Sequence, residues 1–137
     1  MEDDRALEKT IREVLRAHPV QLGLLFGSQA TGEAHEHSDI DIAVEFDSSV
    51  TNAHQAQLSL GVSLARALKT DDVDVIDLTN VRPSIGYAAV KKGRLLVGTP
   101  TRVDELIAEF ERERDRPTGE ERRERFDNAL ERLEELV

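Results

Sequence analysis

Residues 39–46 (DIDIAVEF) alternate between two classes of side chain. Ile40 and Ile42 lie at one set of alternate positions, and Asp39 and Asp41 lie at the other. A period of two residues predicts a β-strand, because successive side chains of a strand point to opposite faces. We therefore expect a sheet with an apolar face and a second face that carries two carboxylates.

Other segments of the chain alternate between helical and extended patterns. Apolar residues at helical spacing predict helices near residues 4–17, over Asn52 to Leu68, and from Pro83 to about Lys92. Short apolar runs predict strands over Val20 to Phe26, Val73 to Leu78 and Arg94 to Val97. Because helices alternate with strands, the predicted fold class is α/β (α+β).

The composition changes after Pro100. Residues 101–137 are rich in Glu and Arg and show no strand pattern. Apolar residues around Phe110 predict one helix, and a stripe that begins at Phe126 predicts a second helix. We expect a domain over residues 1–100 and a charged helical extension over 101–137, either docked as a hairpin or free to bind a partner.

Composition limits the classes of function. The chain of 137 residues has a formal net charge of −10 and no basic patch, which argues against nucleic acid as the main partner. It has no cysteine for a thiol nucleophile and no apolar run near the ~20 residues that cross a membrane. With an acidic N-terminus unlike a signal peptide, a cytoplasmic protein is expected. The acidic, lysine-poor composition resembles that of proteins from high-salt cytoplasm, although an ordinary acidic protein from a GC-rich genome is the alternative.

The pair Asp39 and Asp41 is suited to binding a metal ion. On a strand their α-carbons would be about 6.5 Å apart, with both carboxylates on the same face. Paired carboxylates suit hard cations such as Mg²⁺, and a cation between them explains how both could stay ionised despite their repulsion.

Gly27 and Ser28 form a candidate phosphate site. They lie where the strand Val20 to Phe26 is expected to pass into a helical turn, and backbone N–H groups at such a turn favour an anion. Glycine permits close backbone approach, and the serine adds a hydroxyl donor. Ten residues separate Ser28 from Asp39, so one element could hold a triphosphate while the next strand holds metal ions.

A third acid is needed to complete a two-metal site and activate an attacking hydroxyl. The strand from Val73 offers Asp72 and Asp74 on one face and Asp77 on the other. We choose Asp74, because it is central in the strand and flanked by valines. A lone Asp-x-Asp is common, but its conjunction with Gly-Ser and a later strand aspartate indicates a catalytic site. The glycine-rich loop and lysine of a P-loop are absent from the sequence.

Two segments resemble the signature of the polymerase-beta nucleotidyltransferase superfamily. They are Leu25 to Gly32 (LFGSQATG) and Ser38 to Val44 (SDIDIAV). The strand VDVIDL from Val73 is similar to the third-carboxylate strand of the minimal nucleotidyltransferase (MNT) branch, and the resemblance covers about residues 5–100.

This resemblance implies a small mixed sheet flanked by helices. It also implies two Mg²⁺ ions held by Asp39, Asp41 and Asp74, with ATP as the default nucleotide and its triphosphate at Gly27 and Ser28. Minimal members of this size are often antitoxins that can transfer AMP from ATP to a tyrosine of a helical HEPN toxin.

The sequence is also compatible with other functions. One is a non-catalytic antitoxin that neutralises its toxin by covering it. Another is a transferase for a small molecule of the aminoglycoside type, which usually calls for a further domain. RNA tailing fits the charge least well. The presence of all three aspartates favours the enzyme.

Overall fold

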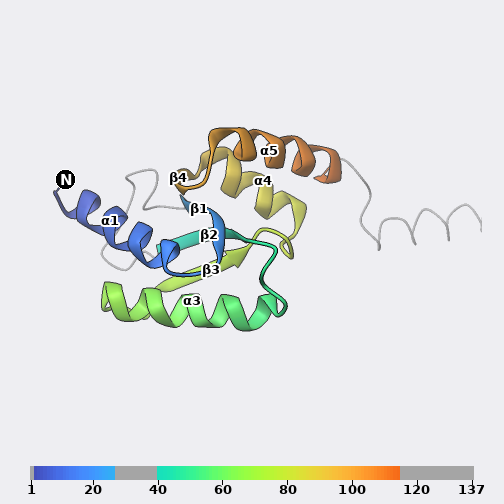
Figure 1. Cartoon of the computed structure of the whole chain (residues 1–137). Helices are drawn as coiled ribbons and strands as arrows, with labels where there is room; N and C mark the ends of the chain where they lie inside the picture. The colour runs from blue at the N-terminus through green and yellow to red at the C-terminus, as the bar shows by residue number, and fades with distance from the viewer. Residues whose placement is uncertain (1, 27–39, 115–137) are drawn as a thin grey trace, which may run out of the picture.

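A computed structural model describes residues 2–26 and 40–114 of the chain (Figure 1). Within them a four-stranded sheet lies between two layers of helices. The elements are α1 (Glu2–Arg16), β1 (Val20–Phe26), β2 (Ile40–Phe46), α3 (Ala53–Leu68), β3 (Val73–Asp77), α4 (Pro83–Lys92), β4 (Arg94–Val97) and α5 (Pro100–Arg114). The predicted α/β class is confirmed, and the predicted elements agree with these bounds to within a few residues.

The sheet is mixed, in the order β3-β2-β1-β4. β1 is antiparallel to both β2 and β4, whereas β2 and β3 are parallel. The parallel pair is joined by α3, which gives the long crossover that such a pair requires. As a result β2 and β3 begin, β1 ends and β4 begins at one end of the sheet.

The two faces of the sheet bury separate apolar clusters. On one face the side chains of α1 and α3 pack against alternate residues of β2 such as Ile42 and Val44. On the other face α4 and α5 cover Leu22, Leu24 and Ala43. The alternation predicted for residues 40–44 is therefore confirmed, and it places Asp41 on the face that carries α4 and α5.

Local sequence signals explain the ends of the helices. Asn52 caps α3 by accepting a hydrogen bond from the backbone N–H of Gln55 at 3.1 Å, and Lys69 ends the helix in the left-handed conformation with φ 56°. Pro83 occupies the first turn of α4. Gly86 lets α4 approach α5, because a Cβ atom there would lie 2.5 Å from the ring of Phe110.

The C-terminal segment is described only in part. α5 buries Leu106 and Phe110 against the sheet and α4, so the first part of the expected extension packs on the body of the protein. The helical turn expected after Ser28 and the helix expected around Phe126 lie outside the described residues. Within the described residues, no helix is long and apolar enough to span a membrane.

Candidate active site

The strand ends bring the chemically interesting residues to one end of the sheet. Asp41, the second residue of β2, is the register partner of Asp74 on β3 and of Phe26 at the end of β1. Neighbouring strands are about 4.8 Å apart, so the α-carbons of the two aspartates are separated by about one strand spacing. Two predicted site residues from distant parts of the sequence are therefore adjacent in the structure.

Asp41 and Asp74 also share a face of the sheet. Val73 and Val75, which flank Asp74, pack in the cluster beneath α1 and α3, as Ile40 and Ile42 do on either side of Asp41. Both carboxylates therefore leave the opposite face. Asp74 is exposed and Asp41 is half-buried, so the pair is accessible at this edge.

Three of the predicted site residues, Gly27, Ser28 and Asp39, lie outside the described residues. Their neighbours in the sequence, Phe26 and Ile40, are the last residue of β1 and the first residue of β2 at the same end of the sheet. No group of three His, Cys, Asp or Glu side chains suited to a metal ion occurs within residues 2–26 and 40–114. The proposed set includes Asp39, so the described part of the chain contains only two of its three carboxylates.

The donor set in the described part fits a hard cation. Two carboxylates on one face, one strand spacing apart, offer oxygen ligands to Mg²⁺. The isoleucines beside Asp41 belong to the buried core and the valines beside Asp74 are partly buried against it, so packing holds both strands in place.

Asp77 has a different environment from Asp74. It is buried, and its carboxylate accepts hydrogen bonds from the backbone N–H of Thr79 at 2.9 Å and from Nδ2 of Asn80 at 3.0 Å. Three residues further along β3, it lies about 10 Å from Asp74. Its carboxylate shapes the turn after β3, which leaves Asp74 as the candidate beside Asp41.

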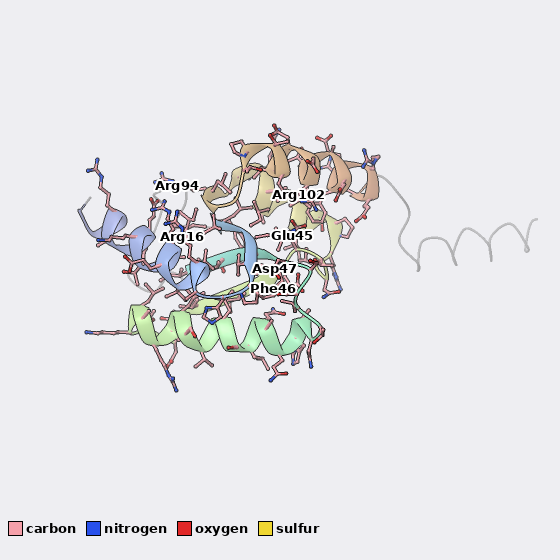
Figure 2. The ribbon with its side chains drawn as sticks, viewed as in Figure 1. Arg16, Glu45, Phe46, Asp47, Arg94 and Arg102 are labelled. Atoms are coloured by element: carbon pink, nitrogen blue, oxygen red, sulfur yellow. The ribbon has the colours of Figure 1, made fainter. Side chains whose placement is uncertain are left out.

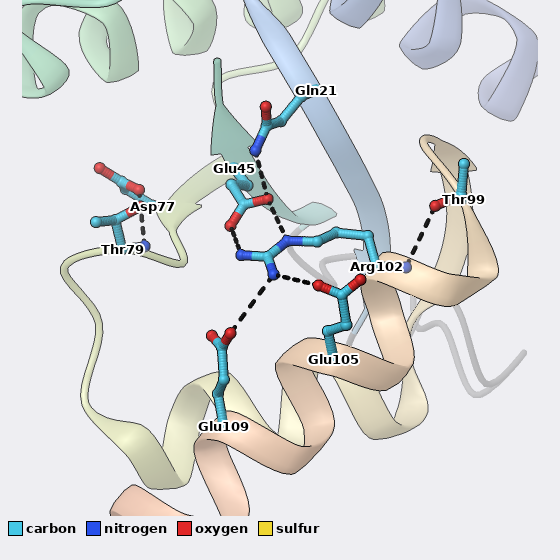
Figure 3. A network of polar contacts seen from close by, with 8 residues as sticks. All are labelled: Gln21, Glu45, Asp77, Thr79, Thr99, Arg102, Glu105 and Glu109. Atoms are coloured by element: carbon cyan, nitrogen blue, oxygen red, sulfur yellow. Dashed lines mark hydrogen bonds and ion pairs between the residues drawn. The ribbon is translucent and has the colours of Figure 1, made fainter. Parts of the chain in front are cut away.

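An ion-pair network at the far end of β2 was missed by sequence reasoning. Glu45 accepts hydrogen bonds from Nε and an Nη of Arg102 on α5, at 2.9 and 2.6 Å, and from Nε2 of Gln21 at 2.7 Å (Figure 3). Arg102 also contacts Glu105 at 3.1 Å and Glu109 at 3.5 Å. Figure 2 shows Glu45 and Arg102 facing each other between the sheet and α5. The sequence feature that could have indicated this network is Glu45 itself, a charged residue between the apolar Val44 and Phe46.

The charges of this network are mutually stabilised. Hydrogen bonds from Arg102, and to a lesser degree from Gln21, hold the pKa of Glu45 below its ordinary value of 4.5, although burial acts in the opposite direction. The hydrogen bond to the Glu45 carboxylate in turn raises the pKa of the Arg102 guanidinium. The network fastens α5 to the strand that carries Asp41.

Comparisons with known proteins agree with this architecture. The sequence model of the family described as "Polymerase beta, Nucleotidyltransferase" matches residues 9–102. The protein adenylyltransferase MntA of Shewanella oneidensis is 39% identical over 103 residues, which are 74% of this chain and 71% of that protein.

Solved structures give the same result. A chain from the crystal structure of a toxin–antitoxin with AMP-PNP matches with a TM-score of 0.71 and 31% identity, over 90% of this chain and 98% of that chain. A chain from the structure of the tri-AMPylated Shewanella oneidensis HEPN toxin in complex with MNT antitoxin matches with a TM-score of 0.67 and 28% identity, over 93% and 98% of the two chains. On the family match and the identity to MntA, the chain belongs to the polymerase-beta nucleotidyltransferase family.

Proposed function

We propose that this protein is a Mg²⁺-dependent protein adenylyltransferase, an antitoxin that transfers AMP from ATP to a tyrosine of a partner HEPN toxin. The observation that carries the proposal is the register pairing of Asp41 with Asp74 on one accessible face. Its support from outside the chain is the 39% identity to a protein adenylyltransferase and the similarity to an MNT antitoxin in complex with an AMPylated HEPN toxin.

In this proposal the carboxylates and the pair Gly27 and Ser28 have separate roles. Asp39, Asp41 and Asp74 would hold two Mg²⁺ ions, while Gly27 and Ser28 would bind the triphosphate. When bound, the ions neutralise charge on the phosphates and on the attacking oxygen. Asp74 lies on a different strand from the other two acids, so it can act on the acceptor while they hold the nucleotide.

The reaction is an in-line displacement at the α-phosphorus. A tyrosine hydroxyl has an ordinary pKa of about 10, so it needs a base to attack at neutral pH. The carboxylate of Asp74 accepts the hydroxyl proton as the tyrosine oxygen bonds to the α-phosphorus. The bond from that phosphorus to the bridging oxygen breaks, and pyrophosphate leaves with the electron pair.

Intact-mass spectrometry tests this function. The protein is mixed with ATP, Mg²⁺ and a helical HEPN protein, to be sought in the neighbouring reading frame, and that HEPN protein should gain one AMP mass per transfer on a tyrosine. α,β-Methylene ATP is the matched control, because its P–C bond does not break and no mass should be added. The reaction should be run at low and high salt, since the acidic composition suits a saline cytoplasm.

Two other functions give different outcomes in the same experiment. If the wild-type protein binds and inhibits its partner without adding mass, neutralisation by covering the toxin is correct. If the partner is neither bound nor modified, an acceptor of another class, such as a small aminoglycoside, becomes the candidate.

A further inference from the structure

Two adjacent lysines end helix α4 beside the candidate active site. The sequence has only four lysines, and two of them, Lys91 and Lys92, are the last residues of α4. Both are exposed. In a chain with a net charge of −10, this concentration of positive charge needs an explanation.

The contacts of the next two residues place the lysines at the end of the sheet that carries Asp41. A Cβ atom on Gly93 would lie 3.2 Å from Cβ of Leu24 and 3.5 Å from the carbonyl oxygen of Leu25. Arg94 is the register partner of Leu25, one residue before Phe26. Because Phe26 is paired with Asp41, the first residue of β4, Arg94, lies about two strand spacings, or about 10 Å, from that aspartate, and α4 ends two residues before Arg94.

The helix that carries the two lysines lies on the same face of the sheet as the two aspartates. Ala89 and Val90 of α4 pack in the same cluster as Leu24 and Ala43, so α4 lies on the face of the sheet to which Asp41 and Asp74 were assigned above. Figure 1 shows α4 and α5 together on one side of the sheet. The side chain of Arg94 lies on the opposite face, where it forms a 2.6 Å ion pair with Glu8 of α1. Figure 2 shows Arg94 on that side, next to α1.

The charges of the two lysines are available to a ligand. Within the described part of the chain, neither forms an ion pair, whereas Arg94 and Arg102 are both paired with glutamates. The C-terminus of a helix carries a partial negative charge, which the lysines offset. Without them, the C-terminus of α4 would present negative charge next to the end of β1 and would repel a polyphosphate bound there.

We propose that Lys91 and Lys92 bind the β- and γ-phosphates of the nucleotide and make the site selective for a triphosphate over a monophosphate. This inference rests on the proposed nucleotidyltransferase function. The β- and γ-phosphates carry most of the negative charge of a triphosphate, and the two lysines would add positive charge there to that of the metal ions proposed above. Lysine is suited to this role, as a compact charge on a flexible stem.

The experiment compares nucleotide affinities of the full-length protein and its variants. Isothermal titration with α,β-methylene ATP and Mg²⁺ is repeated with AMP, which lacks the outer phosphates. The double variant Lys91→Gln/Lys92→Gln keeps the length of both side chains and removes their charge. The matched controls are Lys9→Gln, at an exposed position of α1, and Arg94→Gln, whose side chain lies on the opposite face of the sheet.

The double variant should bind α,β-methylene ATP about tenfold more weakly, the scale of hydrogen bonds to charged groups, with an unchanged affinity for AMP. Both controls should bind like the wild type, and the difference should shrink in 1 M salt, where charges are screened within about 3 Å. Unchanged triphosphate affinity in the double variant, or equal losses for AMP and the triphosphate analogue, would overturn the inference. If the wild type itself binds no triphosphate, the proposed function is what fails.

Discussion

Asp41 and Asp74 are register partners on the parallel strands β2 and β3, and both point to the face covered elsewhere by α4 and α5. Thirty-two residues lie between them in the sequence, including the whole of α3. Both carboxylates reach the same face only in this register of β2 and β3. If one strand were shifted by one residue relative to the other, its aspartate would point into the core.

The first prediction concerns the acid that activates the acceptor. Asp74→Asn should lower AMP transfer by at least about a hundredfold, the low end for loss of a general base. Nucleotide binding should largely remain, because the other two carboxylates hold the nucleotide-bound metal ion in our proposal. Single-turnover transfer measured by intact mass, together with a titration of α,β-methylene ATP, checks both parts.

Asp77→Asn is the matched control for this variant. Its side chain supports the turn at Thr79 and Asn80, so the change should lower the stability and leave transfer close to that of the wild type. The opposite result, with transfer lost in Asp77→Asn and kept in Asp74→Asn, would show that Asp77 is the third carboxylate.

The second prediction concerns the metal ions. The double variant Asp39→Asn/Asp41→Asn should lose the Mg²⁺- or Mn²⁺-dependent binding of α,β-methylene ATP, because two neutral amides cannot replace two anionic ligands. Isothermal titration with and without the metal ion measures this dependence. Unchanged binding in the double variant would remove both residues from the site.

The third prediction concerns Ser28, whose hydroxyl is proposed to orient phosphate without being modified. Ser28→Ala should weaken nucleotide binding by roughly 1–2 kcal/mol, as expected for one hydrogen bond to a charged group. Titration measures the loss, and mass spectrometry of the protein after turnover provides the check. A nucleotide or phosphate recovered on Ser28 would contradict the assignment.

The sequence alone predicts most of the described fold because its patterns are local. The alternation of Ile40, Asp41 and Ile42 specifies which face each side chain takes, and signals such as Asn52 and Pro83 specify where helices begin. These features depend on neighbours within a few residues, so they can be read without knowledge of the tertiary structure.

Long-range relationships could not be derived in the same way. The ion pair between Glu45 and Arg102 spans 57 residues, and no pattern in either segment indicates the other. The pairing of Asp41 with Asp74 required the strand order, which local periodicity does not specify. The position of Lys91 and Lys92 likewise follows from the antiparallel register of β1 and β4.

The last prediction concerns the contribution of Glu45 to stability. The side chain of Glu45 is 10% exposed and that of its partner Arg102 is 31% exposed. In its degree of burial this ion pair is therefore intermediate between a surface ion pair and a buried one. Glu45→Gln should therefore lower the free energy of unfolding by about 2 kcal/mol at pH 7, between the values for those two classes. Urea unfolding at a series of pH values measures the change.

The pH dependence follows from the lowered pKa of Glu45 in the folded state. A depressed pKa contributes stability that is fully present above the unfolded-state value near 4.5 and is lost as the pH falls through the folded-state value. The difference between the wild type and Glu45→Gln should thus be constant above about pH 5 and should shrink below pH 4.5, since a protonated glutamate resembles glutamine. Glu8→Gln, which removes the more exposed pair with Arg94, should change stability by at most about 1 kcal/mol. If the loss in Glu45→Gln were the same at pH 3 as at pH 7, the charge of Glu45 would not be the source of its stabilising effect, and shape or packing would have to explain it.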